Sequence, residues 1–330
     1  MLDNLQVLRA FAAINVVVFH AIGSARDYGT DPLVFAPIAG WGMNGVDLFF
    51  VLSGFVMVIA QARNPKTPGQ FIRGRIARVV PIYWLMTLAF VTLLVAAPSL
   101  FREAEISLTR ALASFLFYSE LILERSPYIY VGWSLEFEML FYVVFALALF
   151  LPSRVLAYLA IVLGVTGLQM AIGLSPLMLE FVLGVLAGIA FVHAPRSQVV
   201  TVLAASVGAV LFLSTIAYQP PVPRWIMWGL PSALLTYGLA GLGNTAGRLG
   251  PFLGDASYSI YLVQVFTIPA WFKISADFGD TRLMADMLVV GASVFTVLVG
   301  VAVYWWVERP ATAVARSTIA TRAATVTNTT

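Results

Sequence analysis

The 330-residue chain contains no cysteine and very few charged residues. Without thiols it can form neither disulfides nor cysteine-ligated metal sites, and it has no cysteine nucleophile. Aspartate, glutamate, lysine and arginine together make up 11% of the residues, whereas a soluble domain carries about 25%. So few charges cannot cover a surface that faces water. The composition therefore excludes a soluble enzyme, a disordered chain and a nucleic-acid-binding protein.

Hydrophobic residues are abundant instead, at 60% of the chain, and the mean hydropathy is +0.91. A helix needs about 20 mostly apolar residues to cross the hydrocarbon core of a membrane. Ten runs approach this requirement: 5–22, 44–60, 81–97, 132–151, 155–172, 177–193, 199–217, 225–242, 257–273 and 284–306. We therefore predict an all-α, polytopic bundle of about ten transmembrane helices, which forms one membrane domain over residues 1–310.

The distribution of lysine and arginine predicts the orientation of this bundle, because these residues accumulate on the cytoplasmic side of a membrane. The segment 61–80 carries five of them and no acid, which predicts a cytoplasmic loop and, since two spans precede it, a cytoplasmic N-terminus. Counting an eleventh apolar run, 107–122, as a span would remove the excess of lysine and arginine on the cytoplasmic side. We therefore expect that run to form an interfacial or re-entrant helix on the outer side of the membrane. The C-terminus is then cytoplasmic, and residues 311–330 are expected to form a short tail without a fold of its own.

Two ionisable residues lie inside the first predicted span, where their cost usually indicates a function. Arg9 and His20 are eleven residues apart, which brings them to within about 20° of one helix face at an axial separation of about 16 Å. Arg9 is expected near the cytoplasmic end and His20 toward the outer half. A simpler alternative stays open, in which Arg9 extends to the inner headgroups and His20 lies at the outer interface without a chemical role.

Acidic residues occupy the second and fourth predicted spans. Asp47 is expected at the level of His20, where a carboxylate can fix the imidazole tautomer and raise its basicity, as a general base requires. Alternatively, Asp47 only caps its helix. Glu136 and Glu138 are about 200° apart around a helix and cannot face one site. Glu138 shares a face with Tyr142 and is the better catalytic candidate.

The predicted cytoplasmic loop continues into the third span with the sequence FIRGRIARVVPIYW (71–84). Arg75 and Arg78 are three residues apart and fall on one helical face, whereas Arg73 lies off it. Two or three guanidinium groups that converge beside a span form a phosphate-binding site, because arginine offers bidentate donors to phosphate oxygens. We call Arg73, Arg75 and Arg78 the arginine patch. The alternative is that the patch only binds anionic lipid and sets the orientation.

Six separated motifs occur along the chain: LQVLRAFAAINVVVFH, GVDLFFVLSGF, FIRGRIARVVPIYW, WSLEFEMLFY, LGDASYSIYL and WWVERP. In this order they resemble the membrane acyltransferase 3 family over nearly the whole chain, from Leu5 to about Pro310. One such motif is weak evidence, but six in sequence are highly specific. The segment GVDLFFVLSGFVM and the compact length are most similar to the exopolysaccharide O-acetyltransferases of bacterial inner membranes.

The resemblance implies a ten-span enzyme of the bacterial inner membrane that transfers an acyl group from cytoplasmic acyl-CoA to a carbohydrate hydroxyl at the outer side. Acetyl-CoA is the expected donor, and no metal is expected. The resemblance also implies that Arg9 and His20 form the essential pair, that Arg75 and Arg78 belong to the basic loop, and that Glu138 is the acid after WSL. The expected partners are acyl-CoA, an exopolysaccharide or lipid-linked sugar, membrane lipid and polysaccharide-assembly proteins, but not nucleic acid.

Two positions depart from the family pattern. Gly74 replaces one of two adjacent arginines of the basic loop, which weakens or re-routes the contact with phosphate. Gln264 stands where many relatives have histidine, so a role in proton relay cannot be assumed there. No fused hydrolase-like domain of the kind some relatives possess is expected, so a second transfer is expected to require another protein.

Residues and resemblance together predict a membrane-bound O-acyltransferase. We expect the nucleotide end of acyl-CoA to stay at the arginine patch, because burying phosphates in the bilayer is prohibitive, and the pantetheine arm to extend past Arg9 toward His20. His20 would act as a general base or carry the acyl group transiently, and Asp47 or Glu138 would orient its ring. The sequence does not choose between these two routes.

An alternative from another class is a proton-coupled transporter or flippase of a sugar or of a lipid-linked intermediate. It would use Arg9, His20, Asp47 and Glu138 as a relay. Inverted repeats and helices broken in mid-span at paired positions would favour it. Neither feature is visible in the sequence.

Overall fold

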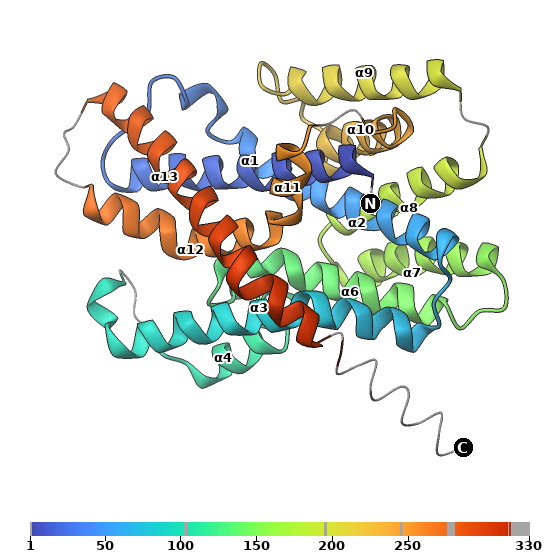
Figure 1. Ribbon diagram of the computed structural model, residues 1–330, viewed down its shortest axis with the longest axis horizontal. Helices are drawn as coiled ribbons and strands as arrows, with labels where there is room; N and C mark the ends of the chain where they lie inside the picture. The colour runs from blue at the N-terminus through green and yellow to red at the C-terminus, as the bar shows by residue number, and fades with distance from the viewer. Residues whose placement is uncertain are drawn as a thin grey trace.

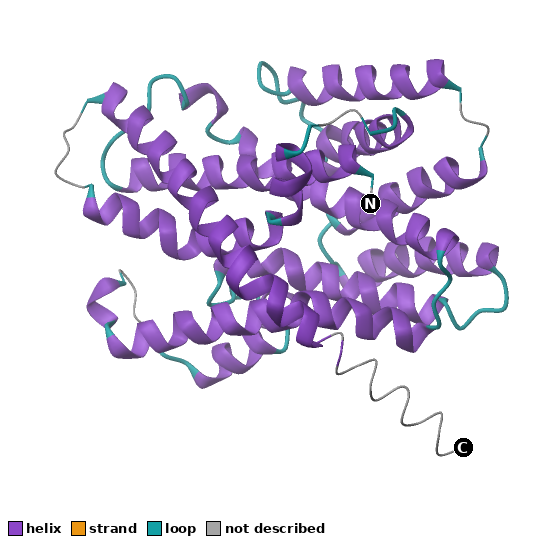
Figure 2. Cartoon of the chain, viewed as in Figure 1, coloured by secondary structure: helices purple, strands orange, loops and turns teal. Residues whose placement is uncertain are grey.

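The computed structural model describes residues 2–101, 105–194, 197–244, 247–275, 281–315 and 317. Within these ranges the chain is folded into helices joined by loops and contains no strand (Figure 2). The all-α fold class predicted from the sequence is therefore confirmed for the described residues. The long helices are α1 (Asp3–Asp27), α2 (Asn44–Arg63), α3 (Pro68–Ala96), α6 (Trp133–Ala148), α7 (Arg154–Ile172), α8 (Met178–His193), α9 (Gln198–Ser214), α10 (Leu230–Gly241), α12 (Ser257–Ile274) and α13 (Arg282–Val303).

Shorter helices join or extend the long ones. The π-helical segments η5 and η6 lead into α10 and continue α13, respectively. The predicted interfacial run 107–122 forms two helices of 8 and 5 residues, each too short to cross a membrane. The short elements are η1 (Ala36–Ile38), η2 (Trp41–Met43), η3 (Pro98–Leu100), α4 (Leu108–Phe115), α5 (Ser119–Leu123), η4 (Tyr130–Gly132), η5 (Trp225–Gly229), α11 (Leu249–Asp255) and η6 (Tyr304–Glu308).

Six described segments are long and apolar enough to cross a membrane: 3–27, 36–63, 68–96, 130–148, 154–172 and 282–315. Helices α8 and α9 are also apolar but have only 16 and 17 residues. Each of the ten predicted runs falls on a helix, while the count of ten crossings and the orientation of the termini stay predictions. The last helix continues through Ala315, five residues into the predicted tail. Apart from residue 317, the rest of that tail lies outside the described residues.

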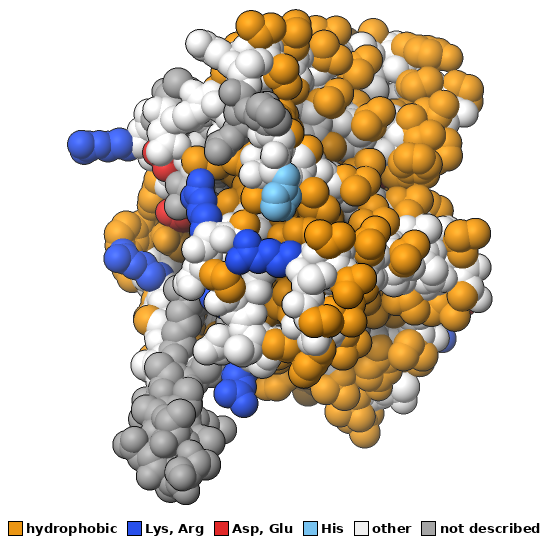
Figure 3. Space-filling view, turned by 90° about the vertical axis from the view of Figure 1, so that its right-hand side faces the viewer, with side chains coloured by type: hydrophobic (Ala, Val, Ile, Leu, Met, Phe, Trp, Pro, Cys, Tyr) orange, Lys and Arg blue, Asp and Glu red, His pale blue; other side chains and the backbone are white. Residues whose placement is uncertain are grey.

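The helices pack around α1 and α2, which run through the middle of the bundle (Figure 1). Helix α2 lies against α8, α10 packs on α9 at one edge, and α12 packs on α13 at another. Helix α2 ends and α3 begins at the right of Figure 1. Figure 3 looks at this end of the bundle: its surface is mostly hydrophobic, and lysine and arginine side chains gather mainly over one part of it. This distribution suits a membrane protein whose cations collect at one boundary.

Glycines let α2 and α8 approach each other closely. A Cβ atom at Gly184 would overlap the carbonyl oxygen of Val51, and one at Gly54 would overlap the carbonyl oxygen of Phe181. Gly188, one turn after Gly184, would place its Cβ 2.9 Å from Cβ of Val58. Small residues at four-residue spacing are a common means of helix association in membranes, where burial of apolar surface provides no driving force. This close pair forms the fixed centre on which the other helices are arranged.

Stacked aromatic rings extend this contact to α6. The ring of Phe181 in α8 stacks on Phe50 of α2 at 4.4 Å and on Phe141 of α6 at 4.5 Å between centroids. All three side chains are buried. Because offset stacking adds to the energy of burial, the three rings hold α2, α6 and α8 in one register. The face of α2 beside this stack is the one that lines the cavity described below.

Replacing Gly184 by alanine is expected to destabilise the protein, because the added methyl group has to push α2 and α8 apart. Overpacking of this kind costs about 1–3 kcal/mol. The matched control is Gly167→Ala in α7, where a Cβ meets nothing within 4 Å and helix propensity favours alanine by about 1 kcal/mol. Thermal unfolding in detergent should show a lower melting temperature for Gly184→Ala only. Equal melting temperatures for the two variants would contradict the packing described here.

Candidate active site

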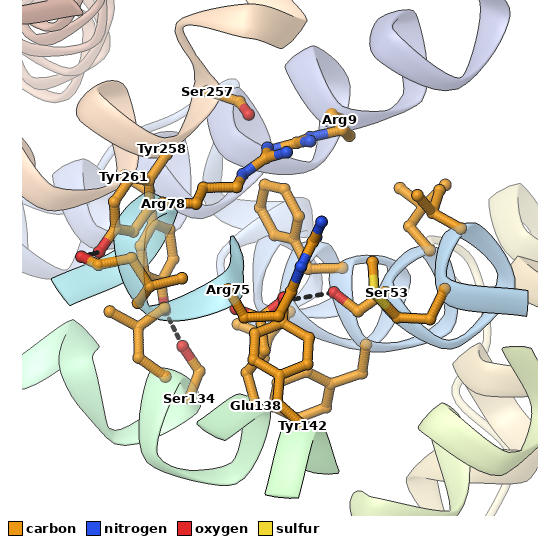
Figure 4. Close-up of a pocket in the computed structure, with 18 residues that line it drawn as sticks. Arg9, Ser53, Arg75, Arg78, Ser134, Glu138, Tyr142, Ser257, Tyr258 and Tyr261 are labelled. Carbon is orange, nitrogen blue, oxygen red and sulfur yellow. Dashed lines mark hydrogen bonds between the residues drawn. The ribbon is translucent and has the colours of Figure 1, made fainter. Parts of the chain in front are cut away.

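A cavity of about 810 Å³, including its opening to solvent, lies between α1, α2, α3, α6 and α12 (Figure 4). Its apolar lining includes Phe49, Phe50, Val56 and Met57 of α2. Its polar lining consists of Arg9, Ser53, Arg75, Arg78, Ser134, Glu138, Tyr142, Ser257, Tyr258 and Tyr261. Residues from five separate stretches of the sequence thus converge on one space.

Three guanidinium groups make this cavity basic. Arg9 comes from α1, whereas Arg75 and Arg78 come from the first turns of α3 and lie on the same face (Figure 4). The Nε atoms of Arg9 and Arg75 are buried and have no hydrogen-bond partner among the described residues. Arg75 lies over the rings of Phe71 and Tyr142, at 5.8 Å from each centroid, which holds its position without consuming its donors. An anion in the cavity would find several free N–H donors.

The third arginine of the patch does not reach the cavity. Arg73 is exposed on α3 and does not line the cavity. The sequence placed it off the face shared by Arg75 and Arg78, and the structure agrees. Gly74 lies between Arg73 and Arg75, and the space beside it is open. The nearest atom to a Cβ placed at this position is Lys66 Nζ, at 3.9 Å.

Two acids balance part of this positive charge. Oε1 of Glu138 accepts hydrogen bonds from the Ser53 hydroxyl at 2.5 Å and from the Tyr142 hydroxyl at 2.6 Å, so Glu138 does share a face with Tyr142 as the sequence predicted. Glu308, in η6, accepts from Ser259 at 2.5 Å. Both acids interact electrostatically with Arg9. From the sequence, Glu308 was identified only as part of the WWVERP motif; an acid just after the apolar run 284–306 was the signal that could have identified it.

His20 does not line the cavity, and its partner is neither of the predicted acids. Its Nδ1 atom lies 2.8 Å from Oε1 of Gln264 in α12, and its ring packs edge-on against Phe19 and Tyr130 with centroids 5.0 Å away in each case. The prediction that Asp47 or Glu138 orients this ring is therefore wrong. Gln264 is fully buried in the middle of an apolar helix. A glutamine inside the apolar run 257–273 was the signal in the sequence that could have identified it as the partner of His20.

Asp47 belongs to a different cluster at the start of α2. Its carboxylate, fully buried, accepts hydrogen bonds from Arg224 Nη2 at 2.6 Å and Arg224 Nε at 3.2 Å. Glu180 of α8 lies beside the same pair, and Arg224 stacks over the ring of Trp228 at 5.1 Å. Arg224 directly precedes η5, which leads into α10. The ion pair therefore holds the start of η5 against α2 and α8. Asp47 caps no backbone group of its own helix in this arrangement, and its nearest partner is a cation and not an imidazole.

Glu136 also has a structural role. Its two carboxylate oxygens accept hydrogen bonds from the backbone N–H groups of Ser119, Glu120 and Leu121 at 2.8–3.1 Å. These groups lie at the start of α5, where the first N–H groups of a helix lack internal partners. Glu136 thus fixes the short helices that follow the third span, and it is divergent from Glu138 as the sequence predicted.

One turn of α12 separates the cavity from His20. The hydroxyl of Tyr261 lies 2.8 Å from the Ser134 hydroxyl and donates to the carbonyl oxygen of Val131 at 2.9 Å. The ring of Phe49 packs edge-on against the ring of Tyr261, with 6.0 Å between the centroids. The carbonyl oxygen of the same Tyr261 accepts a hydrogen bond from Nε2 of Gln264 at 2.7 Å. Tyr261 and Phe49 therefore form a wall whose far side holds the residue that contacts His20.

Comparison with known proteins agrees with these features. Residues 2–305 match a family described as an acyltransferase domain. The chain is also 34% identical, over 290 residues, to the exopolysaccharide production protein ExoZ of Rhizobium meliloti (strain 1021), a match that covers 82% of this chain and 89% of that protein. No solved structure matches the chain. The family match spans nearly all of the helical bundle, including the cavity and His20, and the chain therefore belongs to the membrane acyltransferase 3 family.

Proposed function

We propose that the protein is a membrane-bound O-acyltransferase that moves an acetyl group from cytoplasmic acetyl-CoA to a carbohydrate hydroxyl on the outer side of the bacterial inner membrane. The observation that carries this proposal is the basic cavity, whose wall at Tyr261 is one helical turn from the residue that contacts His20. Membership of an acyltransferase family supports the class of reaction. The relative named for exopolysaccharide production supports an exopolysaccharide or a lipid-linked sugar as the acceptor, with polysaccharide-assembly proteins as partners.

The donor would bind with its phosphates at the arginine end of the cavity. Arg75 and Arg78 offer planar, bidentate donors that match phosphate oxygens, and the free Nε atom of Arg75 adds one more. Arg73, which is exposed outside the cavity, would contact lipid headgroups and not the donor. Arg9, on a neighbouring helix, faces the same space and would bind the inner phosphate or the first amide of the pantetheine arm.

The pantetheine arm would follow the apolar side of the cavity. Phe49, Val56 and Met57 line this side, and they suit a slender chain that carries only two amide groups. Glu138, held by two hydroxyl donors, can accept a hydrogen bond from one of these amides. The thioester then reaches Tyr261. The wall formed by Tyr261 and Phe49 has to open before the acyl carbon can approach His20.

The reaction at His20 balances in either of two routes. In direct transfer, the imidazole takes the proton of the sugar hydroxyl, the oxygen attacks the thioester carbonyl, the C–S bond breaks, and the imidazolium returns the proton to the departing thiolate. In the two-step route, the imidazole attacks the thioester carbonyl, the C–S bond breaks, and coenzyme A departs as its thiolate. The sugar hydroxyl then attacks the acyl-imidazole, the C–N bond breaks, and the hydroxyl proton passes by way of the imidazole or solvent to the thiolate. Both routes yield the sugar ester and coenzyme A with its free thiol.

The variant His20→Ala is expected to lose transfer while remaining folded in the membrane. A general base contributes about 100- to 10,000-fold to a rate, so transfer of radiolabel from acetyl-CoA to the acceptor should fall by about that factor. The matched control is His193→Ala, since His193 is exposed at the end of α8. Substantial acetylation by His20→Ala at equal expression would remove His20 from the mechanism. Purified wild-type protein that neither hydrolyses nor transfers the label would favour a transporter.

The double variant Arg75→Ala and Arg78→Ala is expected to raise the KM for acetyl-CoA at least about tenfold, because each lost charged hydrogen bond costs about 1.5–3 kcal/mol. The control is Arg73→Ala, which removes one arginine charge from the same helix outside the cavity. If the double variant and the control alter KM equally, or if only the orientation in the membrane changes, the arginine patch binds lipid and not the donor.

A further inference from the structure

The contacts of His20 single out one of its two ring nitrogens. Nδ1 lies 2.8 Å from Oε1 of Gln264, and the backbone of Val16, one turn earlier in α1, is a second polar group near the ring. A neutral imidazole carries its proton on one nitrogen only, and the partner of each nitrogen decides which. The question is whether Gln264 offers an acceptor or a donor to Nδ1.

The orientation of the Gln264 amide is fixed by its other contact. Its Nε2 group donates to the carbonyl oxygen of Tyr261 at 2.7 Å, and a backbone carbonyl can only accept a hydrogen bond. If the amide were turned around, its oxygen would face that carbonyl oxygen in a fully buried site, two acceptors would meet without a donor between them, and the lost hydrogen bond would cost about 1–3 kcal/mol. The amide oxygen therefore points to Nδ1, and Nδ1 must donate.

We propose that Gln264 is the positioning residue of His20: it holds the imidazole as the Nδ1–H tautomer and thereby leaves the lone pair of Nε2 as the reacting atom. The consequence for catalysis rests on the proposed function, whereas the tautomer does not. Nε2 is the nitrogen farther from the helix backbone, and it is the atom that would take the proton of the acceptor hydroxyl or attack the thioester. The ring packing of Phe19 and Tyr130 restricts the remaining rotation.

A neutral partner suits this position better than an acid. A carboxylate beside His20 would have to be buried in the middle of an apolar helix, where an ionised group is costly. It would also stabilise the imidazolium and oppose return of the proton to the departing thiolate. The amide fixes the tautomer without either effect. In this respect the site differs from a histidine oriented by aspartate.

The tautomer can be observed directly because the chain has only two histidines. Removing the exposed one by His193→Gln leaves a single imidazole, whose two nitrogens are distinguished by ¹⁵N magnetic resonance of the detergent-solubilised protein labelled with ¹⁵N-histidine. At a pH where the ring is neutral, the proton is expected on Nδ1. In the background of His193→Gln, the variant Gln264→Met should give a mixture of both tautomers, and Gln264→Glu, which keeps an acceptor, should retain the proton on Nδ1.

Two results would overturn the proposal. A proton found on Nε2 in the presence of Gln264 would show that the amide does not set the tautomer. A proton that stays entirely on Nδ1 in Gln264→Met would show that the Val16 backbone suffices and that Gln264 is dispensable. Thr267→Val is the control for disturbance of α12, because Thr267 is buried one turn further on and bonds to Thr296 at 2.8 Å. It should leave the spectrum unchanged.

Steady-state kinetics test the consequence for transfer. Gln264→Met should lower kcat about 10- to 100-fold, as misplacement of a reacting group does, and should change the KM for acetyl-CoA less than about twofold, because the donor cavity lies on the other side of Tyr261. Gln264→Glu keeps the acceptor for Nδ1 but stabilises the imidazolium, so its kcat should lie between those of Gln264→Met and the wild type. A rise in KM with unchanged kcat would contradict a positioning role. If His20→Ala remains active, the proposed function fails, while the resonance result still decides the tautomer.

Discussion

The arrangement of the cavity depends on keeping arginine side chains inside an apolar bundle. An ionised group without a partner in such surroundings costs several kcal/mol, yet three guanidiniums face one space. Glu138 and Glu308 offset part of the charge, and the ring contacts of Arg75 hold that side chain without pairing it. Even with both acids ionised, one positive charge stays in excess. The excess positive charge of the cavity therefore favours an anionic ligand.

Local periodicity explains what could be predicted from the sequence. The apolar runs fall on helices, and the sequence correctly predicted which residues share a face of α3 and of α6. Arg75 and Arg78 line the cavity while Arg73 is outside it, and Glu138 accepts a hydrogen bond from Tyr142. These relations depend only on residues within one helix, where the angle per residue is fixed. The acyltransferase family followed from separated motifs in a fixed order, which composition alone would not give.

Relations between helices could not be predicted in the same way. Asp47 and His20 were paired because their depths in the membrane agree, but depth says nothing about the direction in which each helix faces. The structure turns Asp47 to Arg224, 177 residues away, and turns His20 to Gln264, 244 residues away. Such pairs depend on how each helix is rotated about its axis, and close contacts such as the glycines of α2 and α8 fix that rotation.

The hydrogen-bonded hydroxyl of Tyr261 has a consequence for how the cavity is held together. The ring of Phe49 packs against Tyr261, and the Tyr261 hydroxyl is bonded to the Ser134 hydroxyl and to the carbonyl oxygen of Val131. These contacts join α2, α12 and the segment from η4 into α6 at one point of the cavity lining. A movement that opened the lining at Tyr261 would break all of them. Opening at this point would therefore be cooperative, because the three elements would separate together and not one by one.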